Sequence, residues 1–244
     1  MTKLSIIIPC YNCAGTLADA VDSIYSQDAS IPFDVTMVDD GSNDGTYTVM
    51  QAMAARYPNI QLVRHETNRG GGAARNTAAE NCDGEIIFCL DSDDMLGPGF
   101  LENITRCWLE KRCDGVGISK SIKFRKNNLL DVDYTTDFDS PGEVVRFESL
   151  LDGSMCSLYS TFLLTRAAFQ RIGGYPTQHG FDTQGLAFRF LCNGLTAYTC
   201  PDTTYYHRVN YHQSYYLREA GAGRINANWF QIFDEFLYLF RDEI

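Results

Sequence analysis

Residues 86–94, IIFCLDSDD, combine a buried-strand pattern with a cluster of carboxylates. Residues 86–89 are continuously apolar, which is typical of a strand covered on both faces. Asp91, Asp93 and Asp94 follow at once, and open α/β sheets bind ligands beyond the carboxyl ends of their strands. Carboxylates this close repel one another unless a cation or hydrogen bonds compensate. The stretch therefore predicts either a metal site at a sheet edge or a solvated turn that caps the next helix.

Three further strand patterns precede this stretch, and helical patterns separate them. The strands are expected at residues 4–9, 33–38 and 60–63, and the helices at residues 17–25, 46–56 and 73–81. This alternation predicts an α/β fold with a mostly parallel central sheet, right-handed crossovers and helices on both faces. Each strand ends in polar or acidic residues, so we expect several loops to converge on one edge of the sheet.

The chain beyond Gly99 has weaker periodicity. Helices are expected from Phe100 and at residues 166–172 and 182–192, and β-prone stretches lie at residues 115–124, 157–164, 196–200 and 203–206. Four cations form the only basic cluster, which comprises Lys120, Lys123, Arg125 and Lys126. Acidic residues from Asp131 to Asp139 follow, and we expect this region to be an excursion from the sheet. The C-terminal stretch carries apolar residues at helical spacing, so we expect it to pack on the core or against a second subunit.

Composition restricts the class of protein. The chain has 244 residues and a net charge of −11, which excludes a general nucleic-acid-binding surface. Nine cysteines without regular spacing argue against a secreted disulfide framework and favour reduced thiols in a cytoplasmic protein. Cys10 and Cys13 have metal or redox spacing, but no second such pair accompanies them. We see no signal peptide and no apolar run near the roughly 20 residues of a membrane span.

Four motifs follow the four N-terminal strands in order. They are Pro9-x-Tyr11-Asn12; Asp39-Asp40-Gly41-Ser42-x-Asp44-Gly45-Thr46; Asn68-Arg69-Gly70 with Ala74-Arg75-Asn76; and Asp91-Ser92-Asp93-Asp94. Together they resemble the family-2 inverting glycosyltransferases, which have the GT-A fold. The resemblance covers residues 3 to about 100 and resumes at residues 166–194. Members of that family move a sugar from a nucleotide diphosphate sugar to an acceptor hydroxyl with inversion.

The resemblance implies a role for individual residues on the donor side. Pro9 and Tyr11 would form the stacking wall for a uracil base, Asp40 would accept its N3–H, and Asn12 would also contact the nucleotide. Arg69 and Arg75 would face the diphosphate, which a helix N-terminus also favours. Asp91 and Ser92 would contact the ribose or the metal's surroundings. Asp93 would hold Mn²⁺ or Mg²⁺, since these cations take a few carboxylates together with phosphate oxygens. His207 would join Asp93 at the metal or contact phosphate, and a structural histidine is the alternative. Asp94 would be structural.

The resemblance also assigns the catalytic base. A sugar hydroxyl is a poor nucleophile, so a carboxylate must accept its proton as it attacks. The matching residue is Asp182, and its alternative role is the N-cap of the helix at residues 182–192. Phe181 replaces the family's usual glutamate, and Gln184 stands where a second acidic residue is frequent. Both departures are expected to alter acceptor contacts or to compromise activity.

Several functional alternatives stay open. The leading hypothesis is a metal-dependent transferase with a UDP-sugar donor and a saccharide or lipid-linked acceptor. Its alternatives are a non-catalytic sugar-nucleotide-binding module and a nucleotidyltransferase. The stretch from Lys120 to Lys126 is the candidate for contact with the inner face of a membrane, although a solvated face is the simpler account. Expected units are residues 1–98 for the donor, 99–222 for the acceptor and 223–244 for a C-terminal amphipathic helix.

Overall fold

The computed structural model of the chain describes residues 2–125, 128–138, 142, 144–145, 157–158, 161–178, 181–209, 222–223 and 234–235. The described strands are β1 (Leu4–Cys10), β2 (Phe33–Asp39), β3 (Ile60–Arg64), β4 (Ile86–Cys89), β5 (Met95–Leu96), β6 (Gly115–Arg125), β7 (Asn128–Asp137), β8 (Val144–Val145), β9 (Phe162–Thr165) and β10 (Ala197–Arg208). The described helices are α1 (Leu17–Tyr25), α2 (Thr46–Arg56), α3 (Gly71–Glu80), α4 (Phe100–Lys111), α5 (Arg166–Arg171) and α6 (Asp182–Cys192).

All described strands join one sheet in the order β3-β2-β1-β4-β9-β6-β10-β5, with β7 paired to β6 and β8 paired to β10. The four N-terminal strands pair in parallel, and β10 is parallel to β6. Strand β9 is antiparallel to both β4 and β6, so it joins the first half of the chain to the second. The predicted α/β fold with a central sheet flanked by helices is confirmed.

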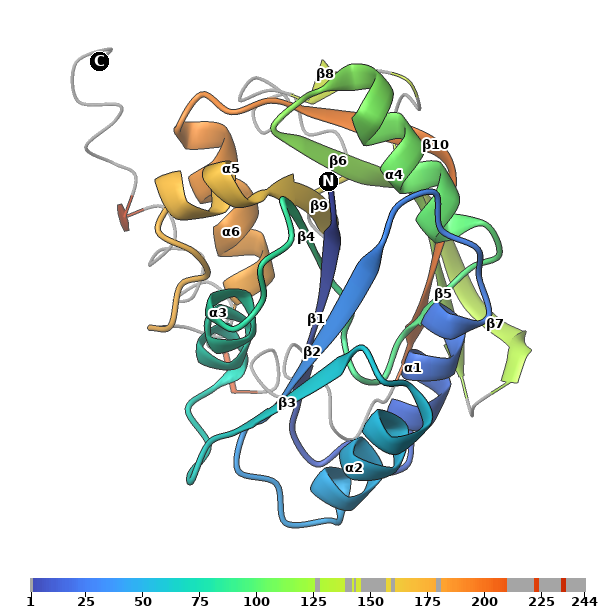
Figure 1. The fold of residues 1–244 in the computed structure, drawn as a ribbon. Coiled ribbons are helices and arrows are strands. Elements are labelled where there is room, and N and C mark those ends of the chain that lie inside the picture. Colours follow the sequence, from blue (N-terminus) through green and yellow to red (C-terminus); the bar gives the residue numbers. More distant parts are fainter. Residues whose placement is uncertain are drawn as a thin grey trace.

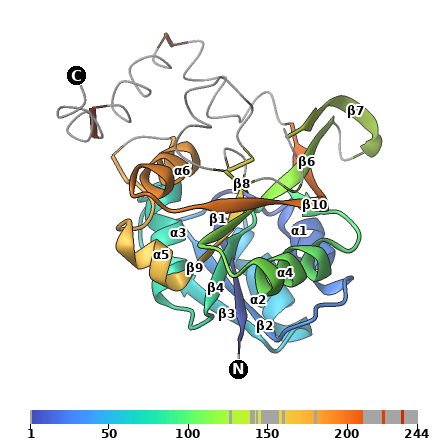
Figure 2. The same cartoon turned by 90° about the horizontal axis from the view of Figure 1, so that it is seen from above.

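Helices cover both faces of the sheet. Figure 1 shows α1, α2 and α4 on one side and α3, α5 and α6 on the other, and Figure 2 shows the same two layers from above. Alternate residues of β1 contribute to different cores: Ile6 and Ile8 pack with α1 and α4, whereas Ile7 packs with α3 and α5. A strand buried on both faces requires apolar residues at consecutive positions. This explains the unbroken apolar run at the start of the chain.

Two sequence expectations about the second half are wrong. Residues 128–137 do not leave the sheet but form β7, which pairs antiparallel with β6. Most of the β7 side chains are exposed, so neither face shows the apolar alternation that marks a half-buried strand. The two short strands expected at 196–200 and 203–206 form a single strand, β10, whose register shifts between Cys200 and Thr204.

The basic cluster is largely neutralised by the β6–β7 hairpin itself. Lys120 Nζ lies 3.2 Å from Asp137 Oδ1, and Arg125 forms an ion pair with Asp133. Lys123 Nζ lies 4.6 Å from the centre of the Tyr134 ring. Each described cation therefore has a partner on the neighbouring strand, as expected for cross-strand pairs that stabilise a hairpin. Lys126 lies outside the described residues.

Other expectations fall on parts of the chain that the structure does not describe. The C-terminal amphipathic helix, His179 and His212 lie outside the described residues, apart from positions 222–223 and 234–235. Glu235 accepts a hydrogen bond from Arg189 Nε at 2.7 Å, so this point of the C-terminal stretch contacts α6. No described helix combines the length and the apolar character needed to cross a membrane. The eight described cysteines are free thiols.

Candidate active site

The loops after β1 and β2 are joined by hydrogen bonds at the carboxyl edge of the sheet. The Asn12 amide donates to Ser42 Oγ at 3.0 Å, and Asn12 Oδ1 accepts from the Asn43 amide at 3.0 Å. Asp44 Oδ2 accepts from the Ala14 amide at 3.1 Å. Asn12 has a φ of 49°, a left-handed conformation that asparagine tolerates better than most residues. The two motifs therefore form one unit, in which Asn12 is a structural link.

Tyr11 presents an exposed ring beside this link. Its side chain is 50% exposed, whereas Pro9 is partly buried within β1. An exposed aromatic ring can stack on any nucleobase. The geometry is therefore compatible with the predicted wall of Pro9 and Tyr11.

Asp40 connects the second strand to the loop before α3. Its Oδ1 accepts from the Arg69 amide at 2.9 Å and lies 2.7 Å from His65 Nδ1, and its Oδ2 accepts from the Gly70 amide at 2.8 Å. His65 Nε2 lies 3.0 Å from Thr77 Oγ1 in α3. Asp40 is buried, and these three contacts account for three of the about four lone-pair sites of its carboxylate. The described Arg69 side chain is exposed, and its Nη1 lies 3.4 Å from His65 Nε2.

His65 links Asp40 to α3. The side chain lies in the loop between β3 and α3 but is buried, because it fills the space between Asp40 and Thr77. Asp39 has a different role from its neighbour. Its Oδ1 accepts from the Ser42 amide at 2.9 Å, which closes the turn after β2.

The acidic loop after β4 is fixed to the end of β10. Asp94 is buried; its Oδ1 accepts from the Arg208 amide at 2.8 Å, and its Oδ2 lies 3.2 Å from His207 Nδ1. Arg208 Nε donates to the Asp93 carbonyl oxygen at 2.7 Å. These contacts agree with the structural role expected for Asp94. They also place His207 next to the acidic loop, although 113 positions separate it from Asp94 in the sequence.

Asp93 carries a carboxylate whose charge is poorly compensated. Burial raises the pKa of Asp93 to about 7, and the charges of Asp94 and Asp91 add to the effect. The charge of Asp94 raises the pKa of His207 to about 8. Within the described residues, no group of three or more His, Cys, Asp or Glu side chains is arranged as a complete metal site. The donor chemistry nonetheless fits a divalent cation that takes its remaining ligands from a diphosphate.

Asp182 and the acidic loop meet at Arg75. Arg75 Nη1 donates to Asp182 Oδ2 at 2.5 Å, and Nη2 donates to Asp91 Oδ1 at 2.6 Å. These three side chains come from α3, α6 and the loop after β4. Arg75 and Asp182 are buried and Asp91 is partly exposed. The structure thus brings the predicted base and the predicted donor-binding carboxylate to one arginine, whose guanidinium was expected to face the diphosphate.

Asp182 does not cap its helix. The N-cap position of α6 is Phe181, and Asp182 is the first helical residue, with its Oδ1 accepting from the Thr183 amide at 2.9 Å. The N-cap alternative for Asp182 is therefore wrong. Phe181 is buried, so its side chain belongs to the protein interior and not to an open surface. Gln184 remains partly buried one position beyond Thr183.

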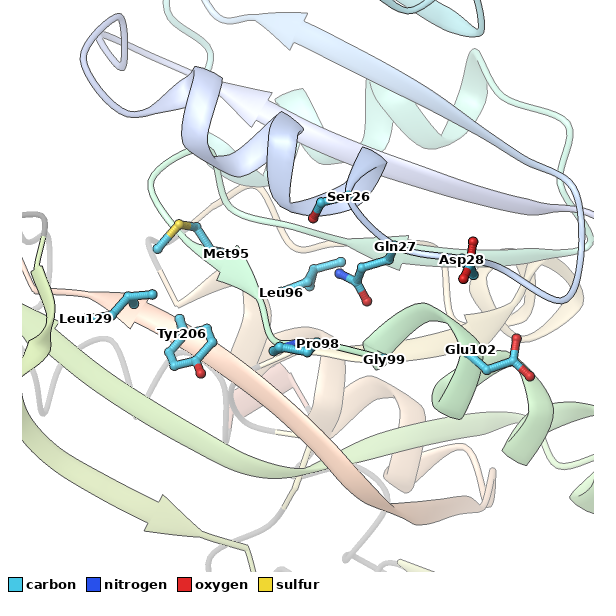
Figure 3. A pocket seen from close by; sticks show the side chains of 10 residues that line it. All are labelled: Ser26, Gln27, Asp28, Met95, Leu96, Pro98, Gly99, Glu102, Leu129 and Tyr206. Atoms are coloured by element: carbon cyan, nitrogen blue, oxygen red, sulfur yellow. The ribbon is translucent and has the colours of Figure 1, made fainter.

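A separate groove of about 560 Å³ opens beside the acidic loop (Figure 3). It is bounded by the end of α1, the β5–α4 turn, β7 and β10. Its lining residues are Ser26, Gln27, Asp28, Met95, Leu96, Pro98, Gly99, Glu102, Leu129 and Tyr206. None of the residues predicted for the donor site or for the base lines this groove.

The model of the family "Glycosyl transferase family 2" matches residues 5–173. The chain belongs to glycosyl transferase family 2. Among curated relatives, it is 38% identical over 99 residues to chondroitin synthase of Escherichia coli, which is 41% of this chain and 14% of that protein.

Solved structures of similar fold include other glycosyltransferases. TarS 1–349 of Staphylococcus aureus, in complex with UDP-GlcNAc, matches with a TM-score of 0.71 and 22% identity, over 88% of this chain and 62% of the other. The mannosyltransferase PcManGT of Pyrobaculum calidifontis, in complex with GDP-Man and Mn²⁺, matches with a TM-score of 0.63 and 22% identity, over 86% and 58%. At these identities the likeness supports the GT-A fold of this family-2 chain.

Sequence reasoning missed several side chains that contact Arg75 and Asp91. Cys89 Sγ accepts from Arg75 Nε at 3.4 Å, and the Arg75 guanidinium lies 5.6 Å from the centre of the Tyr175 ring. Tyr205 Oη accepts from the Asp91 amide at 3.3 Å. Cys89 and Tyr205 lie in predicted strands, but no spacing rule identified the partners of these side chains.

Proposed function

We propose that the chain is a metal-dependent, inverting glycosyltransferase. It transfers a hexosyl or N-acetylhexosaminyl group from a UDP-sugar to a hydroxyl of a saccharide or lipid-linked acceptor. The observation that carries the proposal is the contact of Asp182 and Asp91 with one arginine, because it joins the only predicted base to the donor-side loop.

The donor side is assigned from the edge of the sheet. Tyr11 offers the exposed ring for the uracil, with Pro9 and Asn12 beside it. The remaining lone pair of Asp40 accepts the base N3–H. Exposed Arg69 faces the diphosphate, and Asp91 with Ser92 contacts the ribose. The choice of UDP rests on the family resemblance of the donor-side motifs, and the similar fold of TarS, which is known with UDP-GlcNAc, supports it.

The leaving group requires charge compensation. Asp93 and His207 would hold Mn²⁺ or Mg²⁺, and the bound cation would neutralise charge that develops on the diphosphate. Asp94 holds His207 Nδ1, which leaves Nε2 as the ring nitrogen for a ligand. The similar fold of PcManGT is known with Mn²⁺, which supports a divalent cation here.

The base acts on the acceptor. Asp182 takes the proton of the attacking hydroxyl, the new bond forms at the anomeric carbon, and the bond to the diphosphate oxygen breaks on the opposite face. Burial raises the pKa of Asp182, while the charge of Arg75 opposes that rise. A raised pKa makes the carboxylate a stronger base than an exposed aspartate.

A combined donor and transfer assay tests the function. Thermal-shift measurements with UDP-, GDP- and dTDP-sugars and Mn²⁺ identify the donor, and an acceptor panel then measures turnover and product configuration. We expect UDP-sugars to raise the Tm with Mn²⁺ and to yield an inverted product. A retained configuration would contradict inversion, and stabilisation by GDP-sugars alone would contradict the donor class.

A non-catalytic sugar-nucleotide-binding module is the second candidate. Two observations favour it: Phe181 occupies the position of the usual glutamate and is buried, and both oxygens of Asp182 already accept hydrogen bonds. Binding of a UDP-sugar without transfer and without slow donor hydrolysis would support the module.

Replacing Tyr11 by alanine is expected to raise the Kd for UDP about tenfold, since stacking of one base on an aromatic ring contributes about 1–3 kcal/mol. Calorimetric titration measures the change. Tyr134→Ala is the matched control, because Tyr134 is 48% exposed and lies in β7. Equal affinities of the two variants would remove Tyr11 from the donor site.

Replacing Asp93 by alanine is expected to weaken Mn²⁺-dependent UDP binding by at least about tenfold. The affinity measured in the presence of a chelator should change little, because the lost interaction runs through the cation. Asp131→Ala, a partly buried carboxylate in β7, provides the control. Unchanged manganese dependence in the Asp93 variant would show that another residue holds the metal.

A further inference from the structure

Arg75 is bound on every side by its own chain. Nη1 contacts Asp182 Oδ2 at 2.5 Å, Nη2 contacts Asp91 Oδ1 at 2.6 Å and Nε contacts Cys89 Sγ at 3.4 Å. The ring of Tyr175 lies against the guanidinium. We propose that Arg75 is a positioning residue, which holds the base Asp182 at a fixed place relative to the donor-side carboxylate Asp91. This role rests on the proposed function.

Close packing supports this role, because the Arg75–Asp182 pair fills the space next to the first turn of α3. A Cβ atom at Gly71 would lie 2.7 Å from Arg75 Nη1 and 2.8 Å from Asp182 Oδ2. A Cβ atom at Gly72 would lie 3.3 Å from Asp182 Cβ. The first turn of α3 is therefore in direct contact with the Arg75–Asp182 pair. A surface salt bridge shows no such enclosure, since exposed pairs keep their mobility.

Charge supports it as well. Asp182 and Arg75 are both about nine-tenths buried, and a buried carboxylate is costly unless it is paired and hydrogen-bonded. Arg75 supplies the compensating charge, and its planar fork fixes direction because two different nitrogens contact two different carboxylates. The Asp91 side chain is 33% exposed, so this carboxylate is the one of the two that is open to the donor side.

Loss of the Arg75 contacts with Asp182 and Asp91 should cause a different kinetic defect from loss of a phosphate contact. A phosphate ligand contributes to donor binding, so its loss raises the Kd for UDP and the KM for the donor. A positioning residue affects the reacting geometry, so its loss lowers kcat and leaves donor affinity nearly unchanged. The guanidinium in this structure is already occupied by Asp182 and Asp91, which favours the second outcome.

Arg75→Lys separates the two roles, because lysine keeps the charge but has one nitrogen and cannot bridge both carboxylates as a fork. We expect kcat for transfer to fall about 100-fold, while the Kd for UDP with Mn²⁺ changes less than about threefold. Arg56→Lys is the control, since Arg56 also binds a carboxylate with two contacts, but on the surface of α2. It should retain full activity.

A second variant guards against a purely structural explanation. Arg75→Ala removes the side chain, and added guanidinium ion should restore a measurable part of kcat, whereas sodium at equal ionic strength should not. Circular dichroism establishes that the variants are folded. A loss of UDP affinity beyond about tenfold with kcat preserved would overturn the proposal, and so would unchanged kcat in Arg75→Lys. If the Asp182→Asn variant described below stays active, the assignment of the base fails independently of Arg75.

Discussion

Replacing Asp182 by asparagine should lower the rate of sugar transfer by about 10²- to 10⁴-fold, the contribution typical of a general base. Asparagine keeps the size of the side chain but cannot accept the proton of the attacking hydroxyl. The Kd for UDP should change only a few fold, because the contacts of Asp182 run to Arg75 and to the Thr183 amide. Single-turnover transfer and calorimetric UDP binding measure the two quantities.

Asp114→Asn is the matched control for this experiment. Asp114 Oδ2 also accepts from a backbone amide, that of Thr196 at 3.1 Å, but it precedes β6 at the opposite edge of the sheet. The transfer rate of the Asp114→Asn variant should equal that of the unmodified chain. Substantial transfer by the Asp182 variant would exclude Asp182 as the base.

The dependence of transfer on pH gives an independent check of the base. Burial raises the pKa of Asp182 above the usual range of an aspartate, with Arg75 opposing the rise. The base works in its deprotonated form, so the rate should fall as pH decreases through this raised pKa. The acid limb should be absent from the residual activity of the asparagine variant.

Replacing Gly72 by alanine should lower the free energy of unfolding by about 3 kcal/mol. A Cβ atom there would lie 2.1 Å from the backbone oxygen of Pro176, and a backbone carbonyl cannot turn aside as a flexible side chain can. Helix propensity alone predicts the opposite sign, since alanine in a helix interior is about 1 kcal/mol more favourable than glycine. The expected fall in Tm is about 6–12 °C.

Gly15→Ala is the control for the glycine experiment. Gly15 lies in the turn before α1, and a Cβ atom there would meet no heavy atom within 4 Å. The free energy of unfolding of the Gly15→Ala variant should change by less than about 0.5 kcal/mol. Equal stability of the two variants, measured by denaturant unfolding, would show that the segment around Pro176 can move away from α3. In the Gly72 variant we also expect lower activity, because that segment leads to Asp182.

The architecture of the first half followed from local pattern. Strand β1 is buried on both faces, so its apolar run is unbroken, and α2 has the bounds that its sequence predicted, Thr46–Arg56. The triple glycine was a harder case. These residues precede the helix expected at residues 73–81, but Gly71 and Gly72 form the first turn of α3, and a neighbouring segment packs against Gly72 where a side chain would collide.

Residues whose roles depend on distant partners could not be predicted in the same way. His65 is buried because Asp40 and Thr77 enclose it, and β7 is a strand because β6 offers a hydrogen-bonding edge. The partners of His65 are 25 and 12 positions away, too far to produce a periodic pattern, whereas β6 directly precedes β7 in the chain. Exposed side chains on β7 also removed the alternation by which strands are recognised.

The amino-acid sequence by itself determined which chemical groups stand at the carboxyl edge of the sheet, since motif order and strand pattern are local properties. It also determined the family, because four motifs at fixed spacing are specific together. Only the tertiary structure decided that Arg75 contacts Asp182, which is 107 positions away. The physical reason is packing: α6 reaches α3 on one face of the sheet, and the small residues there allow the approach.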